Sequence, residues 1–219
     1  MFNDKYGLTQ AVLEGRKTQT RRIISKEFFS LVWDEREDTL VYENSDGDFI
    51  DIRKSKYCHY KEGKIVAIAR SYKDMSYGAL WDDCLEFEGV EPTKLAGWNN
   101  KMFVRADYML HRIRINKVRI QRLQDISEVE CMAEGINYYE QEGFSWGSTV
   151  DLFDTPREAY AALIDKISGK GTWESNPYVW VYEFELVKEL VMRCMELKNI
   201  PLRVPLVVDV NCGPTWKEV

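Results

Sequence analysis

Residues 112 to 120 carry an alternating pattern that is typical of a strand with one apolar face. Isoleucines alternate with arginines up to Ile115, and the alternation resumes from Val118. Successive side chains of a strand point to opposite faces, so each half of the pattern builds an apolar face. The apolar positions change from odd to even numbers between Ile115 and Val118. A β-bulge or tight bend at Asn116-Lys117 restores a single buried face, as expected where a barrel strand turns a corner.

Four further segments are expected to form strands. Residues 40–42 and 49–52 flank the turn sequence Asn44-Ser45-Asp46-Gly47-Asp48, which predicts a surface hairpin. Residues 65–69 are a continuous apolar run, which predicts a buried barrel strand. Residues 179–186 are rich in aromatic and β-branched residues and are expected to close the sheet.

Helix signals interrupt these strands at three places. Leu8, Ala11 and Val12 recur at helical spacing before Gly15, which is expected to end that helix in the left-handed conformation. Ser127 and Glu130 form a capping-box pattern, so a helix should begin near residue 128 and end near Gly135, with Glu134 in its last turn. Thr155-Pro156 begins an amphipathic helix that ends at Gly169.

Two long segments lack a clear period. Residues 73–100 are expected to form a connecting region, and long loops in compact domains often cover ligands. Trp81 and Trp98 lie in it, either as covers of a ligand or as packed aromatic residues. Residues 137–153 are expected to form a loop.

Composition limits the classes of function. The chain has 219 residues, which suits one domain with insertions, and no apolar run approaches the ~18 residues that span a membrane. We therefore expect a cytoplasmic protein that has no membrane partner. The net charge of −6 argues against binding to duplex DNA, which requires a basic surface.

Cysteines and histidines indicate neither a disulfide framework nor a metal site. The five cysteines are scattered, with no C-x-x-C pair, and His59 and His111 lack partners at ligand spacing. We expect no metal and no cofactor.

The segment Gly15-Arg16-Lys17-Thr18-Gln19-Thr20-Arg21-Arg22 concentrates cations and hydroxyls directly after the first helix. Arginine offers planar sets of donors, lysine a compact cation or a base when desolvated, and threonine a hydroxyl that donates and accepts. On composition alone this is a solvated charged segment; as a site, it suits an oxyanion or a polar heterocycle.

This segment resembles the G-x-K-x-T-x-R signature of the ASCH family, a β-barrel family related to the RNA-binding PUA fold. Residues 123–127 followed by 133–136 resemble the strand-to-helix passage of the family, and residues 176–184 resemble its closing strand. The similarity is closest to phage and prophage members. It implies an α+β fold, a PUA-like ASCH β-barrel with flanking helices, over residues 1–187. Insertions are expected at about 25–60 and 73–100, and residues 188–219 form a C-terminal extension that packs on the domain or on a partner.

The resemblance also implies a reaction. In small bacterial members, a lysine and a threonine of the first motif and a later glutamate hydrolyse the amide of N4-acetylated cytidine. The matching positions here are Lys17, Thr20 and Glu134. In a regular strand, residues 17 and 20 point to opposite faces, so Lys17 and Thr20 meet only if the backbone turns.

Arginines near these positions are the expected ligand-binding residues. The strand at 112–122 adds a basic stripe, which is either a solvated strand face or a continuation of the site. The expected ligand-binding residues are Arg16, Arg21, Arg22, Arg112 and Arg114.

Three interpretations remain open. The chain is an amidohydrolase acting on an N4-acylcytidine-like substrate, a non-catalytic module that binds a nucleoside, a nucleotide or single-stranded RNA, or a phage-accessory interaction protein that uses its C-terminal tail. The position of Glu134 separates the first two, because catalysis requires its carboxylate near Lys17 and Thr20, whereas binding alone does not.

Overall fold

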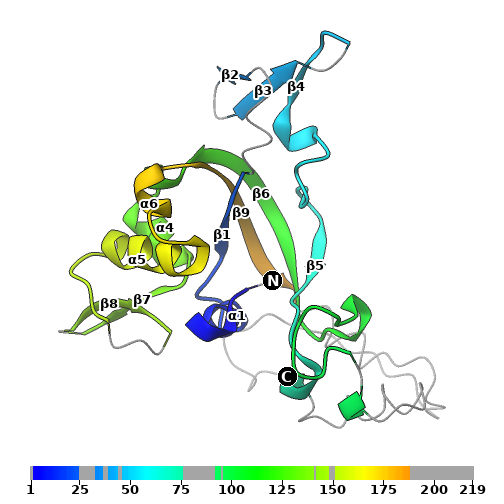
Figure 1. Ribbon diagram of the computed structural model, residues 1–219, viewed down its shortest axis with the longest axis vertical. Coiled ribbons are helices and arrows are strands. Elements are labelled where there is room, and N and C mark those ends of the chain that lie inside the picture. The colour runs from blue at the N-terminus through cyan, green and yellow to red at the C-terminus, as the bar shows by residue number, and fades with distance from the viewer. Residues whose placement is uncertain are drawn as a thin grey trace, which may run out of the picture.

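Two long antiparallel strands form the centre of the structure, which is a computed structural model. It describes residues 2–24, 33–36, 39–43, 46–75, 92–94, 96–140, 142–147 and 151–187. Strand β6 (Arg112–Arg122) pairs with β9 (Tyr178–Val187), β1 (Gln19–Ile23) pairs with the other side of β9, and β5 (Ile65–Ala67) pairs with β6. Figure 1 shows that this sheet is strongly curled into a half-barrel, and the fold class is α+β.

Two smaller antiparallel sheets and several short helices complete the described part. One sheet contains β2 (Trp33–Arg36), β3 (Thr39–Glu43) and β4 (Phe49–Asp51), and the other contains β7 (Ile136–Tyr139) and β8 (Gly143–Trp146). The α-helices are α1 (Leu8–Leu13), α2 (Tyr72–Met75), α4 (Glu128–Ala133), α5 (Pro156–Ser168) and α6 (Thr172–Ser175). In Figure 1, α4, α5 and α6 lie together beside the half-barrel, and the β3–β4 hairpin extends away from it.

The register of β6 against β9 confirms the predicted bulge. Pairing shifts between Ile115 and Lys117, and the apolar side chains before and after the shift are buried in one cluster. Because the bulge inserts one residue, it returns the later apolar positions to the face used by the earlier ones.

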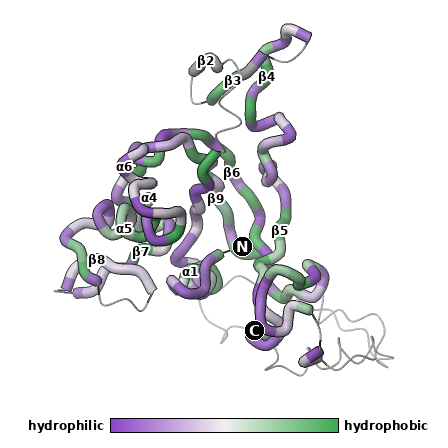
Figure 2. The backbone as a smooth tube through the Cα atoms, in the orientation of Figure 1, coloured by the Kyte–Doolittle hydropathy of each residue, from purple (hydrophilic) through white to green (hydrophobic). Residues whose placement is uncertain are grey.

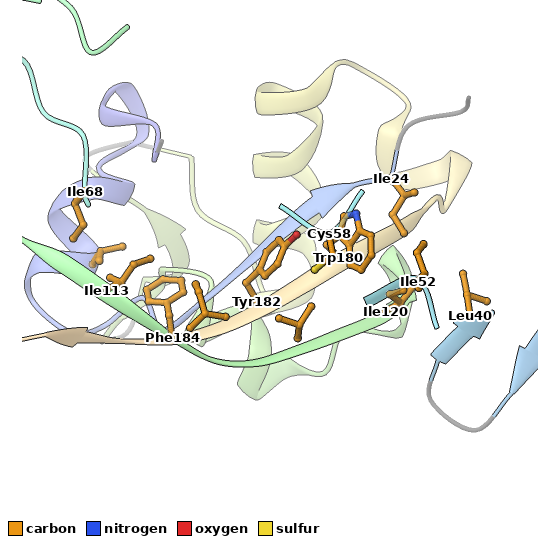
Figure 3. Close-up of a cluster of buried hydrophobic side chains, with 13 residues drawn as sticks. Ile24, Leu40, Ile52, Cys58, Ile68, Ile113, Ile120, Trp180, Tyr182 and Phe184 are labelled. Atoms are coloured by element: carbon orange, nitrogen blue, oxygen red, sulfur yellow. The ribbon is translucent and has the colours of Figure 1, made fainter. Parts of the chain in front are cut away.

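Strand β9 is interior to the sheet, and its residues 179–182 are buried on both faces. Trp180, Tyr182 and Phe184 point to the cluster that also receives the apolar side chains of β6, as the close-up in Figure 3 shows. Val179 and Val181 point to the opposite face and pack with Leu163 and other residues from α4 and α5. This position corrects the expectation that residues 179–186 close the sheet. The face that carries Val179 and Val181 becomes polar at Glu183 and Glu185, so only the first half of the strand requires cover on both faces.

The predicted helix boundaries are confirmed. Ser127 and Glu130 make a reciprocal capping box at the start of α4, and Thr155 caps α5 with Pro156 at its first position. Glu134 is the C-cap residue of α4, and Gly169 is that of α5.

The predicted hairpin at 40–52 is confirmed as the β3–β4 pair, and its hydrophilic tip is visible in Figure 2. It is more than a surface addition, because the side chains of Leu40 and Ile52 belong to the main apolar cluster. The sequence did not indicate β2.

Two expectations about strands and loops were wrong. Residues 65–69 do not form a continuous buried strand: β5 has only three residues, lies at the sheet edge and exposes Ile65. The chain leaves the strand at Ile68, whose N–H donates to His111 O. Residues 137–153 are not a plain loop, because they contain most of the β7–β8 hairpin, where Phe144 also pairs with Phe153. Of the glycines that indicated a loop, Gly143 begins β8 and Gly147 directly follows it.

Parts of the expected connecting region and the C-terminal extension lie outside the described residues, as does Trp81. Trp98 is half-buried and packs against the cluster of Tyr72, Met75 and Met109. For Trp98, the packed interpretation is therefore the one supported.

Gly147 allows the β7–β8 hairpin to approach the N-terminal segment. A Cβ at Gly147 would lie 2.7 Å from Tyr6 O, whereas one at Gly15 meets nothing within 4 Å, although both residues have positive φ. We predict that Gly147→Ala lowers the free energy of unfolding by about 2–3 kcal/mol and Gly15→Ala by about 1 kcal/mol, because only the first adds a backbone clash to the left-handed strain. Urea unfolding measures both. Equal losses would contradict the close approach.

Candidate functional site

The end of α1 fixes where Lys17 lies. Gly15 has φ 75°, and its N–H donates to Val12 O, while the N–H of Arg16 donates to Ala11 O. These two hydrogen bonds form a Schellman motif, as the glycine predicted. The N–H of Lys17 also donates to Ala11 O, so the chain turns sharply and Lys17 precedes β1 instead of belonging to it. The strand argument against a meeting of Lys17 and Thr20 therefore does not apply.

Lys17, Arg21 and Glu134 form a buried ion cluster. Lys17 Nζ lies 2.5 Å from Glu134 Oε2 and 2.7 Å from Glu134 O, and Arg21 Nη1 donates to Glu134 Oε1 at 3.0 Å. The residues are only 2%, 5% and 4% exposed, respectively. Isolated charges at this depth are costly, so each requires the others in place.

A glycine with positive φ turns the chain beside this cluster. Gly135 follows Glu134 with φ 103°, and a Cβ there would lie 3.5 Å from Lys17 Cδ. The positive φ favours glycine over other residues. This turn holds the Glu134 carbonyl and carboxylate on the same ammonium.

Burial lowers the pKa of the Lys17 ammonium below the usual lysine value, because the charged form loses its hydration. The Glu134 carboxylate opposes this effect, and the guanidinium groups of Arg22 and Arg21 add to the lowering. Burial also raises the pKa of the neighbouring Tyr160 phenol well above its usual value. Tyr160 therefore stays protonated at neutral pH, and Lys17 is easier to deprotonate than a surface lysine.

A row of alternating charges continues from Arg21 toward the surface. Arg21 Nη2 lies 3.2 Å from Glu130 Oε2, Glu130 also contacts Arg119, and Arg119 Nε donates to Glu183 Oε1 at 3.0 Å. Burial raises the pKa of Glu130, but hydrogen bonds from Ser127 and Arg119 outweigh it, and the net shift is downward. Glu130 therefore stays ionised and balances Arg21.

The ion cluster lies at a cavity of about 640 Å³ between the N-terminal segment, β1 and α5. Lys17, Thr20 and Glu134 all line it, as the motif resemblance predicted. Lys17 and Glu134 are in direct contact, whereas Thr20 lies on the face of β1 that also holds its strand partner Tyr182. Tyr160 and Leu163 contribute from α5, and the lining is completed by Phe2, Asn3, Asp4, Lys5, Leu8, Arg21, Arg22, Ile23, Lys101, Met102, Ile164, Ile167 and Ser168. A cavity of this size suits a small organic ligand.

The expected ligand-binding arginines divide into two groups. Arg21 and Arg22 line the cavity, although Arg21 is occupied by the two glutamates of α4. Arg16 instead lies in a separate open groove, where it contacts Glu14 and Asn137. Arg16 therefore does not belong to the same site as Lys17.

Arg112 and Arg114 do not reach the cavity, which corrects their assignment to the ligand site. They lie on β6, and β9 separates that strand from β1. Arg114 Nη1 is 3.5 Å from Glu185 Oε1 at an exposed position, as in the solvated-face interpretation. The alternation of side chains along a strand predicts which residues share a face, but it does not predict which strand lies next to it.

Sequence reasoning missed Lys101 and Met102. Lys101 Nζ contacts Phe2 O, Asp4 Oδ1 and Thr9 Oγ1, which fixes the segment around residue 101 to the N-terminal segment at the cavity. Met102 is 74% exposed and lines the same cavity. No periodicity marks these residues, because the contacts depend on the fold alone.

Within the described ranges, no group of histidine, cysteine, aspartate and glutamate side chains could hold a metal ion. No helix among the same residues is long and apolar enough to cross a membrane.

Comparison with protein-family models, with curated proteins and with solved structures gave no match to this chain. Any assignment of function therefore depends on the geometry above and on the motif resemblance.

Removing the central carboxylate tests the ion cluster. We predict that Glu134→Gln lowers the free energy of unfolding at pH 7 by about 3–5 kcal/mol, because Lys17 and Arg21 lose a buried counter-charge. The matched control Glu185→Gln, whose side chain is 54% exposed beside Arg114, should cost at most about 1 kcal/mol. Urea unfolding compares the two variants. Similar small losses would mean that the cluster contributes little to stability.

Proposed function

We propose that this chain binds the base of a nucleoside in the cavity beside β1 and hydrolyses the amide of an N4-acylated cytidine there. The observation that carries the proposal is the convergence of Lys17, Thr20 and Glu134 on one cavity. Glu134 is 117 positions from Lys17. No local sequence rule joins positions this far apart, and only the motif resemblance selects them.

The proposal includes a fold assignment: residues 1–187 form a PUA-like ASCH domain, with insertions at about 25–60 and 73–100. The three motif segments support it by their placement. The first runs from the end of α1 into β1, the second follows β6 and ends just after α4, and the third overlaps the first part of β9. A curled antiparallel sheet with helices beside it is compatible with such a domain.

Each residue has a role in the proposed reaction. Thr20 supplies the hydroxyl that attacks the acyl carbon, Lys17 takes the hydroxyl proton, and Glu134 carries a proton to the leaving N4 nitrogen. Water then hydrolyses the acyl ester and releases a carboxylic acid, so the net reaction is amide plus water to acid plus amine. The lowered pKa of Lys17 favours its role as a base.

One observation favours a second candidate, a module that binds a nucleoside, a nucleotide or single-stranded RNA without turnover. Lys17 Nζ donates to both the carbonyl and the carboxylate of Glu134. An ammonium held in this way is a structural cation, and it becomes a base only after it passes a proton on. The third candidate, an interaction protein using residues 188–219, concerns a segment outside the described residues.

Turnover of N4-acetylcytidine distinguishes the two functions. We predict that Lys17→Ala and Thr20→Ala each reduce kcat by at least about 100-fold, and that the double variant is about as inactive as either single one, because the residues share one proton transfer. Arg114→Ala, which alters an exposed arginine away from the cavity, is the control and should retain activity. Additive, modest losses would assign both residues to binding. If the wild-type protein binds N4-acetylcytidine without turnover, the non-catalytic binding module is the function that remains.

The pH dependence of the reaction tests the role of Lys17. As the pH rises through the lowered pKa of Lys17, the amine loses its proton and becomes able to act as a base. We predict that kcat/KM rises with pH along a limb below the usual lysine pKa of about 10.4. A flat profile across this range would exclude Lys17 as the general base.

A further inference from the structure

Strand β1 has one edge that is not paired within the described residues. The sheet order is β1-β9-β6-β5, so β9 occupies one side of β1 and no described strand occupies the other. Thr20, Arg21, Arg22 and Ile23 all line the 640 Å³ cavity, although alternate residues of a strand point to opposite faces. Four consecutive residues line one cavity only where it extends around the edge of the strand. The cavity therefore includes the free edge of β1.

The ladder with β9 determines which main-chain groups lie on that edge. Phe184 N donates to Thr18 O, and Ile24 N donates to Tyr178 O, so even-numbered positions face β9. In an antiparallel ladder the direction alternates along the chain, and the N–H and C=O of Arg21 and Ile23 therefore point away from β9. Main-chain groups near the interior require partners, and an open edge supplies a row of donors and acceptors.

We propose that this edge binds the pairing edge of the base, with Arg21 C=O accepting from an amino or ring N–H and Ile23 N–H donating to the adjacent ring nitrogen or carbonyl. The inference rests on the proposed nucleoside ligand and extends it by naming the groups that recognise the base. Cytosine and its N4-acyl derivatives present such a donor beside an acceptor. This recognition requires no charge, in keeping with the net charge of −6.

The surroundings favour a base over a peptide strand at the same edge. The cavity is bounded by the N-terminal segment, by Lys101 and Met102, and by α5, and it receives β1 only from Thr20 to Ile23. Two outward-facing residues are few for a strand ladder, which usually extends over several residues. Met102 is 74% exposed, so an apolar side chain is available for one face of a planar ring.

A proline substitution removes one of these donors selectively. Ile23→Pro deletes the outward N–H and leaves the ladder with β9 intact, because proline is tolerated where an edge N–H faces away from the sheet. Ile23→Ala is the matched control, since it shortens the same side chain and keeps the N–H. We expect Ile23→Pro to weaken the binding of N4-acetylcytidine and cytidine about tenfold and Ile23→Ala less than threefold, as measured by calorimetry. Equal affinities of the two variants would overturn the inference.

Amide hydrogen exchange in the wild-type protein provides a second measurement that does not depend on the fold of a variant. The amides of Arg21 and Ile23 should exchange faster than that of Arg22 in the free protein, and N4-acetylcytidine should slow the exchange at Ile23. Protection of Ile23 in the free protein, or no change on binding, would overturn the inference. Binding of N4-acetylcytidine without turnover would contradict only the proposed hydrolysis. If neither N4-acetylcytidine nor cytidine binds, both the proposed ligand class and this inference are overturned.

Discussion

The buried contact between Lys17 and Glu134 determines how the start of the chain is held against the rest of the described structure. Lys17 lies between α1 and β1, and Glu134 lies at the end of α4, so their ion pair joins the N-terminal segment to the helices beside the sheet. Arg21 adds a second contact to the same carboxylate. Buried charges are tolerated only when each is compensated, so these elements have little freedom to shift relative to one another. The cavity keeps its polar wall for the same reason.

Successive side chains of β1 point to opposite faces of the strand. Arg21 points toward α4 and its glutamates, whereas Thr20 and Arg22 also line a small pocket with Tyr182 on the face of the main apolar cluster. The larger cavity includes residues from both faces. A ligand there would contact the ion cluster, the hydroxyl and the strand edge together, which is how one short strand can supply both recognition and reactive groups.

Local sequence signals predicted local structure well. The capping box at Ser127, the glycine that ends α1 and the change of parity after Ile115 each depend on a few neighbouring residues, and each was confirmed. The convergence of Lys17, Thr20 and Glu134 was expected only through the resemblance, because no local rule brings together positions so far apart. The prediction that Arg112 and Arg114 belong to the ligand site was wrong because it depends on strand order. Lys101 was missed because its contacts arise from the tertiary fold.

The interior position of β9 has a consequence for how the chain is made. Strands β1, β5 and β6 all leave the ribosome before β9, which pairs with β1 and β6, so the four-stranded sheet assembles only after residue 187 has been synthesised. Non-local pairing of this kind is slow and leaves unpaired strands exposed to aggregation. The charges of Lys17 and Arg21 are costly to bury in the finished protein, but in the unpaired first strand they and Arg22 favour hydration. The cations of this strand are therefore expected to oppose aggregation of the nascent chain.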